Sequence, residues 1–229
     1  MPISFVGSSA GTNTATPPTH RVGDLMIVFA FRDGSTTNPT KGTGSPTTFT
    51  TITTTTDGTL CSVSAGWKIC ASTSETTGTW TNASRLICVV YRGTLNSGTA
   101  IGTFQPAAGT TDPVNYAART LTNSNVIGSS WFCAFAAHRS TDTSLETPPA
   151  GMTLRQNNVD ATAEASAFDT NGPATGDWPS TNVTAGGTAS GWQTMVIEIK
   201  ADGGELENYK RFSSSTGNTG IISIGEAMG

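Results

Sequence analysis

The sequence is poor in charged residues and contains no long apolar run. Charged residues make up 12% of the chain, whereas a coiled coil needs roughly half Ala, Glu, Lys, Leu and Arg. The longest apolar run, Leu25–Phe31, is far shorter than the roughly 20 residues that span a bilayer. A net charge of −4 argues against a phosphate-backbone partner. We therefore expect neither a nucleic acid nor a membrane as a partner.

Cysteine is also scarce. Cys61, Cys70, Cys88 and Cys133 are too few and too scattered for a disulfide framework, and no pair has the C-x-x-C spacing of zinc or redox sites. Cys61 and Cys70 are expected in one continuous strand, where nine residues span about 30 Å, so a disulfide between them is excluded unless Ala65-Gly66 folds the strand back. Cys88 and Cys133 can meet only if the last strand of the first half pairs with the first strand of the second. We expect buried free thiols.

The first ten residues lack the basic and apolar regions of a secretory signal peptide. We therefore expect the protein to be made in a cytosol and to stay soluble.

What the sequence does contain is threonine, serine and glycine, with 42, 23 and 26 residues respectively. Thr, Val, Ile and aromatic runs alternate with Gly, Pro, Asn and Ser clusters, a pattern typical of all-β proteins. The clearest expected strands are Leu25–Arg32, Phe49–Thr55, Leu60–Ala71, Arg85–Arg92, Trp131–Arg139, Met152–Gln156, Ala161–Phe168 and Gln193–Lys200.

The order of these features recurs in the two halves of the chain. Each half has an apolar opening strand, a Thr/Pro/Gly segment, two further strands, a tryptophan segment (Thr79–Thr81 or Asp177–Pro179) and an apolar closing strand. This order predicts two sets of four strands, possibly an internal duplication. We therefore expect a two-sheet antiparallel jelly-roll sandwich of about eight strands over residues 1–201.

Alternation along the strands predicts which face each residue occupies. Leu25, Ile27, Phe29 and Phe31 fill one face of their strand, as do Met195, Ile197 and Ile199, while Glu198 and Lys200 are expected to point out. The second face of the opening strand, with Met26, Val28 and Ala30, is apolar too. Either overlying loops or another subunit must cover it, and we expect a subunit contact there.

The segment 202–229 differs in character and is expected to be an extended C-terminal arm. It has a Gly-Gly exit, a short helical candidate at Glu205–Phe212, a Ser/Gly spacer and an isolated apolar group. The candidate assembly contacts of the arm are Tyr209, Phe212, Ile221, Ile222 and Ile224, with a disordered terminus as the alternative.

No constellation for catalysis, metal or cofactor binding is evident in the sequence. His20 and His138 stand apart and are expected to be structural or solvated. The acidic residues Glu75, Asp142, Glu146, Glu164 and Asp169 are expected on the surface, because sequence alone cannot pair them across a cleft. We therefore predict no enzyme activity, no catalytic residue, no metal and no cofactor.

Several motifs resemble jelly-roll virion structural proteins of tailed bacteriophages. They are Gly23-Asp24-Leu25, Phe31–Gly34, Ala65-Gly66-Trp67-Lys68 with Thr79–Thr81, and Thr147–Thr153 through Gly191-Trp192. The resemblance covers about residues 20–200, and its motifs are structural rather than catalytic. It implies a capsid-decorating, fibre or adhesin subunit, commonly trimeric and without enzymatic activity.

The leading hypothesis is a capsid decoration or head-fibre subunit, present in the virion and assembled in the host cytoplasm. Its expected partners are copies of itself, as a trimer, and other virion proteins such as the major capsid protein. The alternative is a tail-fibre or receptor-binding module that grips a host surface glycan with Trp80, Trp178 or Trp192. A carbohydrate-active enzyme on a jelly roll is a third possibility.

Overall fold

The computed structural model describes residues 1–42, 44–46, 48–96, 99–122, 130–139, 145, 147–184 and 190–201. The expected arm 202–229, with its assembly contacts Tyr209, Phe212, Ile221, Ile222 and Ile224, lies outside the described residues. In the described part, no helix has the length and apolarity needed to cross a membrane. The strands are β1 (Ser4–Gly11), β2 (Leu25–Asp33), β3 (Thr50–Thr56), β4 (Cys61–Ile69), β5 (Arg85–Arg92), β6 (Ile101–Gly109), β7 (Val114–Tyr116), β8 (Trp131–His138), β9 (Thr153–Val159), β10 (Glu164–Asp169), β11 (Thr181–Val183) and β12 (Trp192–Ile199).

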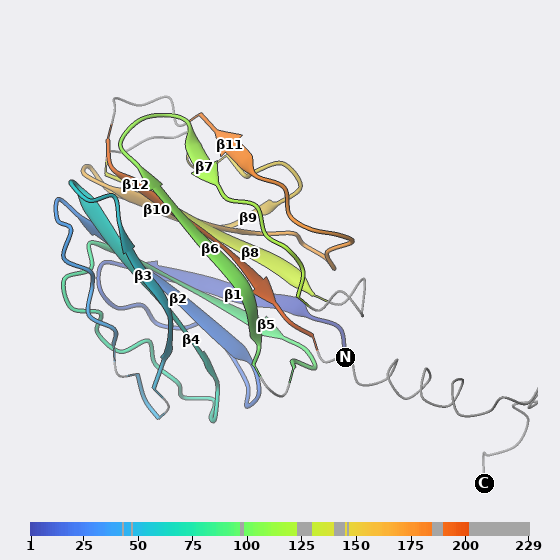
Figure 1. Cartoon of the computed structure of the whole chain (residues 1–229). Helices are drawn as coiled ribbons and strands as arrows, with labels where there is room; N and C mark the ends of the chain where they lie inside the picture. Colours follow the sequence, from blue (N-terminus) through green and yellow to red (C-terminus); the bar gives the residue numbers. More distant parts are fainter. Residues whose placement is uncertain are drawn as a thin grey trace, which may run out of the picture.

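The strands form two stacked antiparallel sheets and one small two-stranded sheet, β11–β7 (Figure 1). The first sheet has the order β1-β5-β2-β4-β3, and the second has the order β6-β12-β8-β10-β9. The all-β, two-sheet prediction is confirmed. Each large sheet takes all its strands from one half of the chain, so this order does not confirm the jelly-roll connectivity.

All eight expected strands are present, and four more were not predicted. Two of these, β1 and β6, are edge strands whose sequences are rich in Gly, Ser or Ala and, in β6, contain Pro106. Such residues have low strand propensity, and Pro is tolerated at a sheet edge. Pairing with β5 and β12 therefore makes strands of them, and each half contributes five strands to its sheet rather than four.

The two halves have the same strand order, with β1, β2, β3, β4 and β5 corresponding to β6, β8, β9, β10 and β12. Across the sandwich β1 contacts β9, β5 contacts β10, β2 contacts β8, β4 contacts β12 and β3 contacts β6. Exchanging the halves reproduces these five contacts, whereas a further contact between β5 and β9 has no counterpart of similar extent between β12 and β3. The sandwich therefore has approximate twofold symmetry, with β2 and β8 at its centre, as an internal duplication predicts.

Phe29 of β2 and Phe135 of β8 occupy equivalent positions, because each pairs with an alanine, Ala65 of β4 or Ala167 of β10. The two rings stack on each other with centroids 5.1 Å apart and planes 7° apart. The core between the sheets includes the predicted inward residues of β2 and β12. These residues are Leu25, Ile27, Phe29, Phe31, Met195, Ile197 and Ile199.

Glu198 corrects one expectation about the last strand. It does face away from the core, but it is fully buried rather than solvated. Its carboxylate accepts hydrogen bonds from the backbone N–H groups of Thr103 and Thr122, at 3.2 and 3.0 Å. Glu198 therefore fastens the segment around Thr122 to the outer face of the second sheet.

Candidate functional site

The outer face of the first sheet is covered by the chain itself. Met26, Val28 and Ala30, the predicted subunit contacts, have no exposed area. They pack in one apolar cluster with Ala15, Phe49, Trp80 and Ala83 from three connections between strands. The alternative of overlying loops describes this face, so these three side chains offer no surface to another subunit. We call this covering, formed by residues 12–24 and 70–84 and by the described residues of 34–49, the first cap.

A buried ion pair lies within the first cap. Lys68 of β4 donates to Glu75 at 2.7 Å, and both side chains are almost completely buried. The ammonium group also lies 4.6 Å from the ring centroid of Phe49. His20 accepts a bond from the backbone N–H of Glu75 at 3.1 Å, and its Nδ1 lies 2.8 Å from the carbonyl oxygen of Pro18. Both ring nitrogens of His20 are therefore engaged within the cap.

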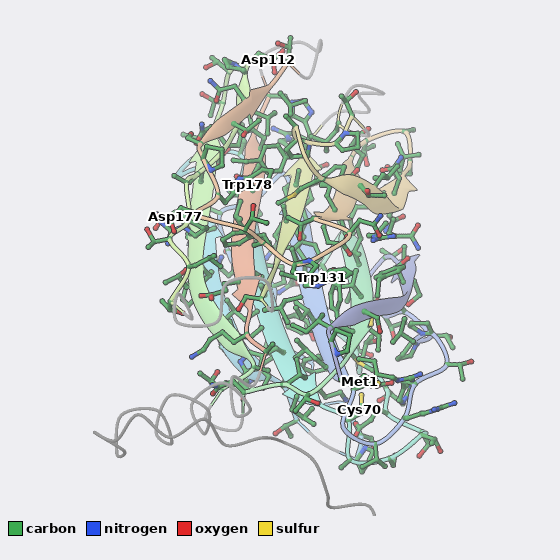
Figure 2. All side chains as sticks on the ribbon, turned by 90° about the vertical axis from the view of Figure 1, so that its right-hand side faces the viewer. Met1, Cys70, Asp112, Trp131, Asp177 and Trp178 are labelled. Carbon is green, nitrogen blue, oxygen red and sulfur yellow. The ribbon has the colours of Figure 1, made fainter. Side chains whose placement is uncertain are left out.

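The outer face of the second sheet is covered by the equivalent connections, 110–122 and 170–184 together with described residues of 139–152. Phe132, Ala134 and Ala136 of β8 pack there against Val114, Tyr116, Leu121, Leu145, Met152, Ala174, Trp178 and Val183. We call this covering the second cap. Figure 2, in which the second sheet faces the viewer, places Trp178 over that sheet and Asp177 toward its outer edge.

The two caps contain the same short motif, Thr-Gly-x-Trp, at Thr77–Trp80 and at Thr175–Trp178. The backbone N–H groups of Trp80 and Trp178 donate to carbonyl groups on equivalent connections, of Asn13 and Arg119, both at 2.7 Å. The sequence comparison noticed the two tryptophan segments but missed the shared Thr-Gly. The shared Thr-Gly was the signal in the sequence that the backbone N–H groups of both tryptophans make equivalent hydrogen bonds.

The indole groups of the two motifs differ. The Trp80 indole N–H donates to the carbonyl of Thr77 at 3.1 Å, in a turn where Gly78 has a positive φ of 62°. Gly176, at the matching position, is outside that left-handed region. The Trp178 indole N–H is buried and has no hydrogen-bond partner in the structure. A buried polar group without a partner typically costs about 1–3 kcal/mol.

Two substitutions between equivalent positions explain the difference. Gly66 pairs with Val28 as Phe168 pairs with Ala134, so these two residues correspond. Trp80 lies directly over Gly66, where an added Cβ would be 3.1 Å from the indole. In the second half the Phe168 side chain occupies that place and packs edge-on against Tyr116.

The second substitution concerns Lys68, which pairs with Met26 of β2. Its counterpart is Thr170, which stands beside Phe132 and accepts that residue's backbone N–H at 3.3 Å. Threonine is much shorter than lysine, and it cannot fill the volume that the Lys68 side chain fills in the first cap. A pocket therefore remains in the second cap.

This pocket has a volume of about 290 Å³. Phe132, Ala174 and Trp178 are its buried apolar residues, while Thr175, Gly176 and Asp177 are exposed. One carboxylate oxygen of Asp177 accepts the backbone N–H of Leu121 at 2.9 Å. The remaining lining residues are Gly151, Thr170 and Pro173. We call this hollow the Trp178 pocket.

A wider hollow of about 560 Å³ lies at the first cap, between residues 10–20 and 73–76. Its lining includes His20 and Glu75 together with the hydroxyl residues Thr14, Thr16 and Thr76. The polar atoms of His20 and Glu75 are bonded within the cap, as given above. The first cap therefore presents a groove whose buried polar groups already have partners.

The other tryptophans proposed for glycan binding are enclosed. Trp80 has no exposed area and Trp192 is 5% exposed. The Trp192 indole N–H donates to the carbonyl of Thr111 at 2.8 Å. Of the three proposed aromatic residues, Trp178 lines one of these two hollows.

Three acidic residues expected on the surface are buried. Glu75 belongs to the ion pair of the first cap, and Glu164 is fully buried at the end of β10. Asp169 is also fully buried and receives both Arg155, at 2.8 and 2.7 Å, and the hydroxyl of Tyr91, at 3.1 Å. Glu75 and Asp169 each form an ion pair, with Lys68 and Arg155, which composition alone cannot reveal. Asp142 and Glu146 lie outside the described residues.

His20 and His138 are both buried, in agreement with a structural role rather than a solvated one. Within the described ranges, no three His, Cys, Asp or Glu residues are grouped so as to hold a metal ion.

All four cysteines are free and buried, as predicted. Cys61 and Cys133 face the core, whereas Cys70 and Cys88 lie under the first cap. Burial raises the pKa of Cys61 and of Cys88 to about 12, and that of Cys70 to about 11. The thiols are therefore protonated at neutral pH and unreactive as nucleophiles.

No protein-family model matches the chain, and no curated protein is significantly similar to it. The resemblance to bacteriophage virion proteins therefore stays a prediction.

Proposed function

We propose that the protein is a non-enzymatic structural subunit of a bacteriophage virion, a capsid decoration or head-fibre subunit that self-associates as a trimer. The observation that carries this proposal is the edge strand β3, Thr50–Thr56, which contains six threonines and pairs with β4 alone. An edge strand offers unpaired backbone groups to another chain. Threonine side chains allow neighbouring copies to approach without charge repulsion.

The two caps direct association to such edges, because both outer sheet faces are covered by the chain itself. A threefold interface joins two different surfaces of neighbouring copies. We place β3 on one side of that contact. Other virion proteins, such as the major capsid protein, are proposed as further partners. The proposal does not depend on jelly-roll connectivity, which stays a prediction.

The first test is the oligomeric state of the purified chain by light scattering. We expect a trimer, and a strict monomer at micromolar concentration contradicts self-association. The double variant Thr54→Lys/Thr56→Lys places two charges at exposed positions of β3 and should shift the protein toward monomer. Thr153→Lys, at an exposed position of edge strand β9, is the matched control and should leave the oligomer unchanged.

The second test concerns location. Mass spectrometry and antibody labelling of purified particles should find the chain on the virion. A particle preparation without the chain overturns the virion proposal. Deleting residues 203–229 then tests the expected arm: a folded variant that no longer joins particles supports it, and normal assembly contradicts it.

The second candidate function is a receptor-binding module that recognises a host surface glycan. The Trp178 pocket is the specific observation that favours it, since the exposed Thr175 and Asp177 lie there beside the apolar side chains of Phe132 and Trp178.

A further inference from the structure

We infer that the free edge of β3 binds residues 221–224 from the arm of a neighbouring copy as an added strand. The inference rests on the proposed self-association and names the two surfaces that meet in it. The arm lies outside the described residues, so the docking surface is argued from β3 and its surroundings.

The sandwich has two margins at which edge strands of the two sheets meet, β1 with β9 and β3 with β6. In the β1–β9 margin the Ser8 hydroxyl donates to the carbonyl oxygen of Arg155 at 2.8 Å. The side-chain amide of Asn158 donates to the carbonyl oxygen of Gly11 at 2.7 Å. The Arg155 guanidinium also lies 4.4 Å from the ring centroid of Phe5. Side chains of both sheets therefore close this margin.

The β3–β6 margin, which is equivalent by the approximate twofold symmetry, carries apolar residues in place of two of these polar ones. The pairing register places Phe104 of β6 where β1 has Ser8. β3 and β9 each have a bulge at the same point of their register, so Ile52 of β3 matches Arg155 of β9. Neither apolar side chain has a hydrogen-bonding group. They therefore cannot close this margin as Ser8 and Arg155 close the other.

The β3–β6 margin also exposes an aromatic side chain. Phe104 is 36% exposed, although it pairs with Ile197, which belongs to the core between the sheets. Directly opposite residues of an antiparallel pair share a face, so the Phe104 ring lies at the margin of that core. A partner that brings apolar side chains to this margin covers the ring.

The backbone of β3 is available to such a partner. β3 pairs with β4 alone and contains neither a charged residue nor a proline, two features that commonly protect an edge strand. β6, the other edge strand of this margin, contains Pro106. The carbonyl oxygen of Phe104 in β6 also accepts a hydrogen bond from Arg119 at 3.1 Å. We therefore place the added strand on β3 rather than on β6.

The arm contains an uncharged sequence that suits this edge. Residues 221–224 are Ile-Ile-Ser-Ile, and β-branched residues favour strands. Ile222 and Ile224 share one face of a strand, which matches the exposed ring of Phe104, while Ser223 occupies the opposite face. Neither this segment nor β3 carries a charge, so two copies meet without electrostatic repulsion.

The place where the arm begins supports the same occupant. The backbone N–H of Lys200 donates to the carbonyl of Ala100 at 2.8 Å, so the chain leaves the second sheet beside the start of β6. Residues 202–220 span about 60 Å when extended, about twice the length of a nine-residue strand. The arm therefore reaches the β3 edge of a neighbour. A threefold ring needs two different surfaces on each copy, and the arm and β3 supply them.

The experiment places single cysteines on the two surfaces of the full chain. One pool carries Thr54→Cys and the other carries Ser223→Cys, and the two are co-expressed with different affinity tags and treated with a short bis-maleimide. The four native thiols are buried and stay unreactive. We expect a covalent heterodimer with both tags, because both positions lie on strand faces that point away from the core.

Thr153→Cys, at an exposed position of edge strand β9, replaces Thr54→Cys in the matched control and should give no heterodimer. A chain that carries both Thr54→Cys and Ser223→Cys tests the alternative occupant, the arm of the same copy. A link found only within one chain assigns the edge to that arm and overturns the inference. The absence of any link overturns it as well.

A second measurement does not depend on the linker. Ile222→Asp/Ile224→Asp should shift the oligomer toward monomer and make amide hydrogen exchange in β3 at least about tenfold faster. Thr216→Asp/Thr219→Asp adds the same charge to the spacer and should change neither. A trimer that survives Ile222→Asp/Ile224→Asp overturns the inference and leaves the proposed self-association standing. A monomeric unmodified chain contradicts both, and the detection of the chain in particles is independent of either result.

Discussion

The first and second caps cover equivalent faces of equivalent sheets, yet the space that Lys68 fills in the first is an open pocket beside Thr170 in the second. The hollow of the first cap lies elsewhere, between residues 10–20 and 73–76. The first cap buries the Lys68–Glu75 ion pair and satisfies the indole of Trp80. The second cap has Thr170 in place of the lysine and an unsatisfied indole on Trp178. The common strand order therefore determines where the connections run. A few side chains determine whether the space beneath each connection is filled.

The two caps show how a repeated architecture can fill a space in one copy and leave a pocket at the equivalent place in the other. The strand order and the backbone bonds of both tryptophans are common to the halves. Gly66 and Phe168 differ in volume at one position, and that difference displaces the overlying indole. Close packing leaves no room for both a phenylalanine and a tryptophan at that place.

The largest expected effect tests the equivalence of the halves in the core. Phe29→Ala and Phe135→Ala should each cost about 3–5 kcal/mol of unfolding free energy, because each removes one ring of the central stack. Urea unfolding of both variants measures this. Similar costs support the approximate symmetry, and a cost for one that is less than half that of the other breaks it.

The next effect concerns the ion pair that distinguishes the first cap. Lys68→Met should cost about 3–5 kcal/mol, since it leaves the Glu75 carboxylate buried without its counter-ion. The double variant Lys68→Met/Glu75→Gln removes both charges and should recover part of the loss. Thr170→Val, at the equivalent place, should cost only about 1 kcal/mol. Equal costs for the two single variants in urea unfolding would show that the ion pair does not stabilise the cap.

A smaller effect on stability is expected from replacing each of the two indole groups. Trp80→Phe and Trp178→Phe remove the same ring volume, but only the first also leaves an acceptor, the Thr77 carbonyl, without its donor. Trp80→Phe should therefore be more destabilising than Trp178→Phe by about 1–2 kcal/mol. Thermal and urea unfolding of the pair provide the measurement. The reverse order would mean that the Trp178 indole is satisfied in solution.

The smallest effect for a single group is a pH dependence to which the first half contributes three thiols and the second half one. Burial raises the pKa of Cys61, Cys70 and Cys88 in the first half above the ordinary 9.0. The unfolded thiols ionise first, so stability is full below about pH 9 and falls as pH rises toward the folded values, by at most about 1.4 kcal/mol per pH unit per thiol.

Urea midpoints measured from pH ~8 to pH ~10 test this dependence. Replacing the three first-half thiols by alanine should flatten the profile more than Cys133→Ala does. An unchanged profile in the triple variant would assign the dependence to other groups.

Sequence patterns predicted the strands whose side chains alternate or are apolar throughout, including both faces of Leu25–Phe31. They did not predict β1 and β6, because the Gly, Ser, Ala and Pro of these strands adopt extended structure only through pairing with β5 and β12. The candidate site was predicted in one part: Trp178 was named as a glycan-binding residue, together with Trp80 and Trp192, which the structure shows enclosed. The pocket beside Trp178 had no local signal.

By itself the sequence determined the all-β class, the free thiols, the inward faces of the strands and the recurring order of features in two halves. These depend on local alternation and composition, which each strand carries within its own residues. Only the tertiary structure decided that Met26, Val28 and Ala30 are covered by the chain's own connections and that a pocket remains beside Trp178. Both outcomes depend on whether side chains far apart in sequence fill the same volume, as Lys68 and Glu75 do in the first cap and Thr170 does not in the second.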